Sequence, residues 1–248
     1  MKAVILAAGA GTRLGKYTEE LPKTLVDVGG FPILAHTLKS IVECGITEIM
    51  IVTGYEAGKV EEFVKSMDIG AEYSVEYVHN KKFGETNNIY SIYLTRDLLE
   101  GESFVLINSD VLFHPDILKG LVNSPRRGVI LSVDFTVEIA EEEMKVKVEG
   151  DRIVAISKEL PPEEADGEYI GMTRIDAEGS TEFFDAVSKT LRDEGYNVFY
   201  EAAYQRMIVE GNYVTYEDTR GLPWIEIDTP EDLQMARNVV APRILAGK

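Results

Sequence analysis

The sequence predicts an α/β protein built on a doubly wound, mostly parallel mixed sheet, with a smaller α+β portion towards the C-terminus. Continuous apolar runs over 3–7 and 103–107 are typical of strands buried on both faces. Segments with helical spacing of apolar residues alternate with such runs over the first ~130 residues, which is typical of parallel sheets with helical connections.

The first half predicts four strands, each followed by a helix. Alternating or continuous apolar residues indicate strands over 3–7, 48–53, 73–79 and 103–107. Apolar residues at helical spacing indicate helices over 32–44, 59–67, 88–99 and 115–122. Pro32 suits the first position of its helix, and Gly45 suits the residue that ends it.

The second half predicts a different order of elements. Three strands come first, over 129–135, 144–148 and 153–157, and the tight turn at 149–152 makes the last two a hairpin. Helices over 181–193 and 201–210, strands over 213–216 and 224–227, and a final helix beginning at 229–231 follow. We therefore expect a boundary near residue 134, between a first half over 1–133 and a second half over 134–248 that includes the C-terminal helix. The two halves are expected to share one sheet.

Composition excludes several classes of protein. The 248 residues are 45% hydrophobic and 27% charged, which is a globular balance. The net charge of −18 leaves no electrostatic footprint for nucleic acid or for an anionic membrane. One cysteine and three scattered histidines argue against a disulfide framework and against a zinc site. No apolar stretch is long enough for membrane insertion, so we expect a cytoplasmic protein.

A glycine-rich turn directly after the first strand is the strongest motif. The sequence Leu-Ala-Ala-Gly-Ala-Gly-Thr-Arg-Leu at 6–14 is followed by Pro-Lys-Thr-Leu at 22–25. Successive backbone N–H groups in such a turn form an anion-binding concavity, to which Arg13 and Lys23 add positive charge. Leu14 replaces the third glycine of a dinucleotide fingerprint, and a Walker A loop lacks its required residues here. A purely structural turn is the alternative.

Two aspartates follow strands in a way that indicates a metal site. Asp110 comes after the strand at 103–107, where ligands of open α/β sheets bind. Strand alternation places Glu226 and Asp228 on one face of the segment at 224–228. Mg²⁺ is commonly held by one or two carboxylates together with substrate phosphates. The alternative is that Asp110 and Asp228 cap the helices that follow them.

These motifs resemble the signature of the sugar-phosphate nucleotidyltransferase superfamily. The resemblance covers the chain in order, and it implies that the glycine loop wraps a nucleoside triphosphate. It further implies that Arg13 and Lys23 act on phosphates as catalytic residues and that Asp110 and Asp228 hold Mg²⁺. The residues that the resemblance assigns to the nucleotide in these motifs are Leu6, Ala8, Gly9, Gly11, Thr12 and Ser109.

The segment Asn-Asn-Ile-Tyr-Ser at 87–91 is similar to the cytidylyltransferase branch, including phosphocholine and inositol-1-phosphate cytidylyltransferases. In that branch the segment lies along the nucleoside, so Asn87 and Asn88 are assigned to nucleotide binding and CTP is favoured. On local grounds alone, Asn87 is equally a helix N-cap.

The resemblance makes the half over 1–133 the nucleotide-binding half and the half over 134–248 the acceptor-binding half. Lys145 and Lys147 share one face of the strand at 144–148. One of them, assigned as Lys147, is expected to reach the phosphate of the acceptor. The alternative is that both lysines lie on an exposed face of the hairpin. Segments at 168–171 and 200–204 resemble the family's acceptor site. The other residues assigned to the acceptor are Glu168, Tyr169, Gly171, Glu201 and Glu226, the last also as an alternative metal ligand.

The activity expected from the resemblance is joining of CTP to a phosphorylated alcohol, giving a CDP-alcohol and pyrophosphate. The expected partners are the triphosphate and a small acceptor such as phosphocholine or inositol 1-phosphate, and a homodimer is compatible with the sequence. Two alternatives remain at this point: transfer from UTP, dTTP or GTP to a sugar 1-phosphate, and a catalytically silent nucleotide-binding subunit.

Overall fold

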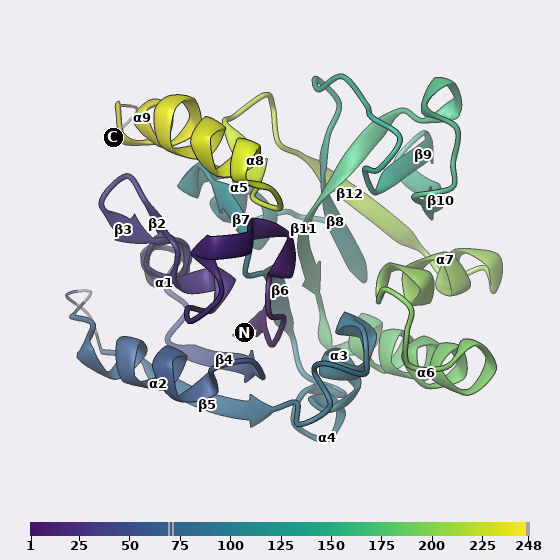
Figure 1. Cartoon of the computed structure of the whole chain (residues 1–248). Helices are drawn as coiled ribbons and strands as arrows, with labels where there is room; N and C mark the ends of the chain where they lie inside the picture. The colour runs from purple at the N-terminus through teal and green to yellow at the C-terminus, as the bar shows by residue number, and fades with distance from the viewer. Residues whose placement is uncertain (69, 71, 247–248) are drawn as a thin grey trace. The chain divides into compact units, whose positions relative to one another are not determined.

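The computed structural model describes residues 1–68, 70 and 72–246, whose helices and strands are labelled in Figure 1. The chain divides into two compact units. Unit 1 comprises Met1, Glu85–Leu106 and Lys119–Gly221. Unit 2 comprises Lys2–Gly84, Ile107–Leu118 and Leu222–Lys248. Each unit is thus assembled from segments that are distant in the sequence, and neither has a border between residues 133 and 134. The assignment of nucleotide and acceptor binding to the two halves stays a prediction.

Unit 2 is built on three parallel strands. These are β1 (Lys2–Ala7), β4 (Glu48–Thr53) and β5 (Ser74–His79), with β4 in the middle. The register of β1 on β4 runs from Ala3 opposite Ile49 to Ala7 opposite Thr53. Continuous apolar sequence is explained by burial on both faces, since Ala3, Val4 and Ile5 have no exposed surface.

Two short antiparallel pairs complete the strands of unit 2. They are β2 (Asp27–Val28) with β3 (Phe31–Pro32), and β7 (Val111–Phe113) with β13 (Trp224–Glu226). The strand β6 (Phe104–Asn108) and the helix α5 (Pro115–Val122) each contribute residues to both units. The other helices of unit 2 are η1 (Thr12–Tyr17), η2 (Lys23–Leu25), α1 (Ile33–Glu43), α2 (Ala57–Ser66), α8 (Pro230–Met235), the π-helical turn η4 (Ala236–Val240) and α9 (Ala241–Ala246).

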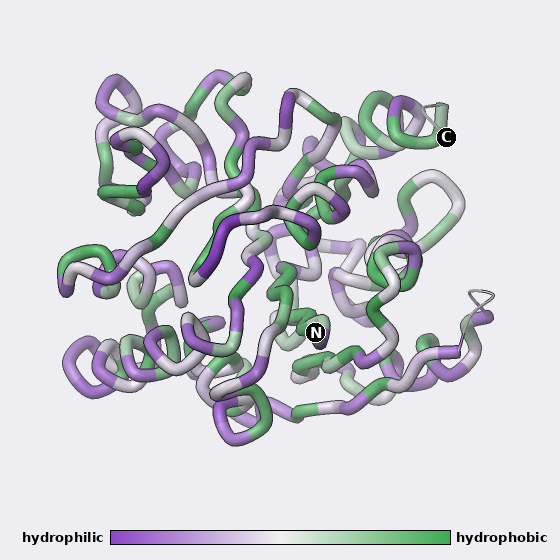
Figure 2. Tube along the Cα trace, turned by 180° about the vertical axis from the view of Figure 1, so that it is seen from behind, coloured by the Kyte–Doolittle hydropathy of each residue, from purple (hydrophilic) through white to green (hydrophobic). Residues whose placement is uncertain are grey.

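A buried cluster in unit 2 joins the glycine loop to the C-terminal helices. Its members are Leu14, Val26, Val28, Ile33, Leu112, Ile227, Leu233, Ala236, Val240, Ala241 and Ile244. In Figure 2 the helical run at the C-terminal end carries both hydrophobic and hydrophilic residues, as expected of helices with one buried face. The cluster holds Leu14 of the glycine loop together with Leu112 and Ile227, which stand close in sequence to Asp110 and Asp228.

Unit 1 has a mixed arrangement of strands. In addition to the start of β6, its strands are β8 (Val129–Asp134), β9 (Lys145–Glu149), β10 (Arg152–Ser157), β11 (Gly167–Ile175) and β12 (Val214–Asp218). Five of these strands lie side by side in the order β11-β8-β12-β10-β9. In this order β8 and β12 are parallel, and the other neighbouring pairs are antiparallel. The hairpin expected over 144–157 is present as β9 and β10, and β11 was not expected from the sequence. Together with unit 2, this confirms the α/β class with a mixed sheet.

The helices of unit 1 correct one expectation. They are α3 (Asn88–Tyr93), α4 (Arg96–Leu99), η3 (Pro162–Glu164), α6 (Ala177–Glu194) and α7 (Glu201–Val209). A single helix over 88–99 was predicted, but the chain breaks between α3 and α4. Thr95, which is fully buried, donates its hydroxyl to Ile92 O at 2.7 Å and so satisfies the local backbone by a side-chain bond.

No helix in the described part of the chain is both long enough and apolar enough to span a bilayer.

Candidate active site

Asp110 and Asp228 are brought together by the pairing of β7 with β13 in unit 2. Glu226 lies opposite Val111 in this pair, and Ile227 N donates a hydrogen bond to Asp110 O at 3.0 Å. Asp110 precedes β7 and Asp228 follows β13. Because paired antiparallel strands place the start of one beside the end of the other, the two carboxylates meet on neighbouring strand ends.

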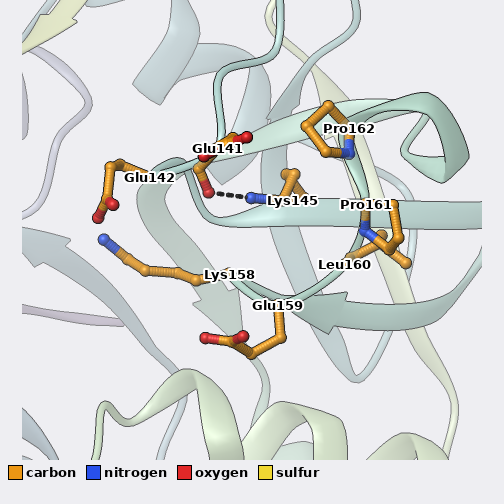
Figure 3. A pocket seen from close by; sticks show the side chains of 8 residues that line it. All are labelled: Glu141, Glu142, Lys145, Lys158, Glu159, Leu160, Pro161 and Pro162. Atoms are coloured by element: carbon orange, nitrogen blue, oxygen red, sulfur yellow. Dashed lines mark hydrogen bonds between the residues drawn. The ribbon is translucent and has the colours of Figure 1, made fainter.

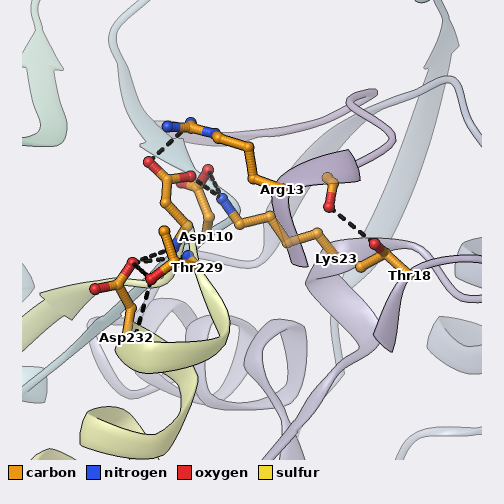
Figure 4. A network of polar contacts seen from close by, with 8 residues as sticks. Arg13, Thr18, Lys23, Asp110, Thr229 and Asp232 are labelled. Atoms are coloured by element: carbon orange, nitrogen blue, oxygen red, sulfur yellow. Dashed lines mark hydrogen bonds and ion pairs between the residues drawn. The ribbon is translucent and has the colours of Figure 1, made fainter. Parts of the chain in front are cut away.

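Two cations face these carboxylates (Figure 4). Lys23 Nζ donates to Asp110 Oδ2 at 2.8 Å and to Asp228 Oδ1 at 2.5 Å. Arg13 Nη2 lies 2.8 Å from Asp228 Oδ2. The side chain of Lys23 is 11% exposed and that of Arg13 is 66% exposed. Lys23 is therefore an interior cation that bridges two acids, whereas Arg13 reaches the same site from solvent.

The charges of this cluster reinforce one another. Burial by itself would lower the pKa of Lys23, but attraction to Asp110 and Asp228 outweighs burial and raises that pKa. Burial would likewise raise the pKa of Asp228, but Lys23 and Arg13 hold it below its ordinary value. Lys23 is thus positively charged and Asp228 negatively charged at neutral pH.

The glycine loop packs directly on Lys23. Gly11 has a left-handed backbone with φ +62°, and a Cβ at Gly11 would lie 2.7 Å from Lys23 Cβ. Thr18 Oγ1 donates to Gly11 O at 2.8 Å and to Gly15 O at 3.2 Å, which closes the loop on itself. Only glycine gives both this conformation and this close approach, so the loop and Lys23 form one structure.

The remaining loop residues differ in their accessibility. Leu6 and Ala8 are buried, and Ala8 O accepts a hydrogen bond from Tyr55 N at 3.0 Å. Gly9 and Thr12 are exposed, and no described heavy atom lies within 4 Å of where a Cβ on Gly9 would be. Gly9 and Thr12 are therefore accessible from solvent, and anion binding by the loop stays a prediction.

Three carboxylates of unit 2 lie close enough together to bind a divalent cation. One carboxylate oxygen each from Asp110, Glu226 and Asp228 lies within 4.8 Å of the others. Among the described residues, Asp110 Oδ1 is buried and has no hydrogen-bond partner, as expected of an atom that serves as a ligand. An all-oxygen donor set of this kind suits Mg²⁺. Ser109, which is half-buried, stands beside Asp110 in the chain.

Asn87 and Asn88, in unit 1, use their side-chain oxygens to organise the backbone. Asn87 is the N-cap of α3, and its Oδ1 accepts from Asn88 N at 2.7 Å. Asn88 Oδ1 accepts from Tyr200 N at 2.9 Å. The N-cap alternative for Asn87 is therefore present in the structure, and a role of these residues in nucleotide binding stays a prediction.

Four residues assigned to the acceptor lie in or beside a cluster of three buried tyrosines in unit 1, Tyr169, Tyr200 and Tyr204. Tyr169 Oη is 2.8 Å from both Thr173 Oγ1 and Tyr200 Oη. Glu168 and Glu201 are also buried, at 6% and 5% exposure. Gly171 has φ +76° where the register of β11 on β8 shifts between Tyr169 and Thr173. The hydroxyl of Tyr169 is engaged within the protein, and acceptor binding by these residues stays a prediction.

The two lysines of β9 share a strand but do not have equal surroundings. Lys145 has no exposed surface, and its ammonium group is held by the carbonyl oxygens of Ala140, Glu141 and Glu143. Lys147 is partly exposed, with Nζ 3.7 Å from a carboxylate oxygen of Glu164. These carbonyl oxygens belong to the acidic segment at 138–143, and they make the burial of Lys145 tolerable.

Sequence reasoning missed Lys158, which follows β10. It lines a pocket of about 340 Å³ in unit 1, where its ammonium group points towards Glu142 (Figure 3). The other lining residues are Glu141, Glu142, Lys145, Glu159, Leu160, Pro161 and Pro162. The available signal was a lysine directly after a strand, and a single lysine in that place is too common to indicate a site.

Sequence comparison with known proteins shows the family of the chain. Residues 2–144 match the model of the nucleotidyl transferase family. The chain belongs to that family. It is 30% identical over 246 residues to a bifunctional IPC transferase and DIPP synthase of Aquifex aeolicus, with 99% of this chain covered. It is 39% identical over 113 residues, 46% of this chain, to a choline-phosphate cytidylyltransferase of Streptococcus pneumoniae.

A solved structure extends the likeness over the full fold. The inositol-1-phosphate CTP transferase of T. maritima superposes with a TM-score of 0.77 at 26% identity, covering 96% of this chain and 97% of that chain. This chain spans 53% of the Aquifex protein, which is about half the length of that relative. The alignment with the Streptococcus protein covers 46% of either chain.

Proposed function

We propose that this chain transfers a cytidylyl group from CTP to a phosphorylated alcohol. An oxygen of the acceptor phosphate attacks the α-phosphorus of CTP. The bond from that phosphorus to the oxygen bridging to the β-phosphorus breaks, and pyrophosphate leaves. The products are a CDP-alcohol and pyrophosphate. Because a phosphate monoester is already ionised near neutral pH, the reaction needs no strong general base.

The observation that carries the proposal is the bridge from Lys23 to both Asp110 and Asp228 beside the glycine loop. Asp110 and Asp228, with Glu226 close by, are the residues that would hold Mg²⁺. A bound Mg²⁺ would neutralise and orient phosphate oxygens. Exposed N–H groups of the glycine loop bind the triphosphate, and Lys23 and Arg13 oppose the negative charge that develops at the α-phosphorus.

Support for CTP comes from the relatives, whose names include choline-phosphate cytidylyltransferase and inositol-1-phosphate CTP transferase. For the acceptor we propose a phosphorylated alcohol, with Lys147 as the lysine first assigned to its phosphate. Lys158 is a second candidate because it lines a pocket whose lining does not include Lys147. Lys147 instead lies near Glu164.

The proposal is tested by pyrophosphate release from CTP, UTP, dTTP and GTP, each with phosphocholine, inositol 1-phosphate and glucose 1-phosphate. We expect release with CTP and one of the phosphorylated alcohols, and an Asp110→Asn enzyme serves as the inactive control. Release only from another triphosphate with the sugar phosphate would replace this function by sugar-phosphate activation. Nucleotide binding without release from any pair would indicate a silent subunit.

The acceptor lysine is tested separately with Lys147→Met and Lys158→Met. Loss of the lysine that meets the acceptor phosphate raises the KM of the acceptor and leaves the KM of CTP unchanged. Lys189→Met, which removes a surface lysine paired with Asp185 and Glu210, is the matched control.

A further inference from the structure

A capping box stands at the start of α8, and its hydrogen bonds extend to Asp228, the residue before the N-cap. Thr229 is the N-cap, and its hydroxyl accepts from Asp232 N at 3.2 Å. Asp232 Oδ2 in turn accepts from Thr229 N at 2.7 Å. These two bonds complete a capping box. The same oxygen also accepts from Asp228 N at 3.0 Å and from Thr229 Oγ1 at 2.9 Å, so it does more than cap the helix.

As a result, three consecutive N–H groups around Asp228 have defined acceptors. Ile227 N donates to Asp110 O at 3.0 Å, and Asp228 N and Thr229 N both donate to Asp232 Oδ2. The bond from Ile227 fixes the segment to the strand end that carries the other acid. The two bonds to Asp232 fix the turn by which the chain leaves β13 and enters α8.

Buried side chains pack on either side of this turn. Ile227 and Leu233 have no exposed surface, and both belong to the cluster that contains Leu14 of the glycine loop. Asp228 itself is 18% exposed at its side chain. Its backbone is therefore held from the buried side by packing and from the polar side by one carboxylate oxygen, which Figure 4 shows beside Thr229.

We infer that Asp232 is a positioning residue that holds Asp228 in the orientation in which its carboxylate meets Asp110, Lys23 and a divalent cation. The inference rests on the proposed function, because it assigns Asp232 to the support of a proposed metal ligand. Residues that hydrogen-bond behind metal-binding groups fix the orientation of those groups, and their loss commonly weakens metal binding 10–100-fold.

Glu231 provides a matched control. It occupies the same first turn of α8, carries the same charge and is exposed. A general loss of negative charge near the site would affect Glu231→Ala and Asp232→Ala alike. Loss of the bonds to Asp228 N and Thr229 N affects only the change at Asp232.

The experiment measures Mn²⁺ binding by the electron paramagnetic resonance signal of free Mn²⁺, with a non-hydrolysable CTP analogue at saturation. The proteins are wild type, Asp232→Ala, Asp232→Asn and Glu231→Ala, all below their melting temperatures. We expect Asp232→Ala to bind Mn²⁺ roughly 10–100-fold more weakly than wild type. Asp232→Asn, whose amide oxygen can still accept, falls between them, and Glu231→Ala equals wild type.

Each result decides the inference. Wild-type Mn²⁺ affinity in folded Asp232→Ala, or equal weakening in Glu231→Ala, overturns it and leaves the proposed function standing. If Asp232→Ala does not fold, Asp232→Asn decides in the same way. Failure of the wild-type protein to bind Mn²⁺ beside the analogue overturns the proposed metal site and this inference together.

Discussion

Lys23 Nζ lies 2.5 Å from Asp228 Oδ1 and reaches Asp110 Oδ2 from the same position. The single positive charge of this ammonium group is thus shared by the two acids that are proposed to hold a metal ion. A divalent cation and Lys23 are therefore expected to compete for these oxygens until triphosphate draws Lys23 and Arg13 away.

Replacement of Lys23 by methionine tests this competition. Without nucleotide, we expect Lys23→Met to bind Mn²⁺ roughly tenfold or more tightly than wild type, which corresponds to about 1.4 kcal/mol. The melting temperature falls in metal-free buffer, because two acids are left close together, and Mg²⁺ restores it. Calorimetric titration and thermal denaturation provide the measurements.

The control for this change is Lys39→Met, which removes an exposed lysine of α1 in the same unit. It should leave both Mn²⁺ affinity and melting temperature at the wild-type values. Unchanged Mn²⁺ affinity in Lys23→Met would show that Lys23 does not compete with the metal.

Asp110→Asn tests the acid that follows β6. The amide keeps the shape of the side chain but removes its charge, so folding is preserved while cation binding is lost. We expect turnover in pyrophosphate release to fall by roughly 10²–10³-fold, as for other single losses of preorganised electrostatic stabilisation. Asp116→Asn, an exposed acid in the first turn of α5, should retain wild-type turnover. Near wild-type turnover in Asp110→Asn would remove Asp110 from the site.

Gly11→Ala tests the contact between the glycine loop and Lys23. The left-handed backbone costs a non-glycine residue about 1–2 kcal/mol, and the new Cβ would lie 2.7 Å from Lys23 Cβ. We expect the free energy of unfolding in urea to fall by at least this amount, and the KM for CTP to rise.

Gly58→Ala is the matched change for Gly11→Ala. Gly58 lies within α2, and no described heavy atom lies within 4 Å of the new methyl position. Alanine there should raise the free energy of unfolding by about 0.5–1 kcal/mol. Equal effects at the two glycines would refute the assigned contact.

The buried tyrosines predict how stability depends on alkaline pH. Burial is the largest cause that raises the pKa of Tyr169, Tyr200 and Tyr204 in the folded chain. The unfolded chain loses these protons near pH 10 whereas the folded chain keeps them. Their contribution to stability is therefore complete below pH 10 and is lost as pH rises above it, by about 1.4 kcal/mol per pH unit for each tyrosine.

Denaturant unfolding between pH 8 and pH 11.5 measures this slope, and Tyr169→Phe should reduce it by one tyrosine's share. Absorbance at 295 nm provides an independent check. The chain has 12 tyrosines, and ionisation of all of them while the native circular dichroism persists would contradict the prediction.

The local sequence was sufficient to predict most strands and helices. It was also sufficient to single out Asp110, Glu226 and Asp228, which the structure brings together. Strands buried on both faces are continuous apolar runs, and a glycine loop followed by Pro-Lys is visible in the chain itself. The strand β11 was missed because its central Gly171 adopts a positive φ at a register shift, which interrupts the usual pattern. The break between α3 and α4 was missed because it lies at Thr95, whose hydroxyl donates to the carbonyl oxygen of Ile92, a bond that the apolar pattern does not reveal.

The sequence by itself determined which side chains this protein has at its strand ends, because charge type and strand periodicity are local properties. Only the tertiary structure decided that Lys23 bridges Asp110 and Asp228, residues 87 and 205 positions away. It also decided that Lys145 is enclosed by carbonyl oxygens whereas Lys147 is not. The physical reason is that burial and ion pairing depend on which strands become neighbours, and pairings such as β7 with β13 join segments more than a hundred residues apart.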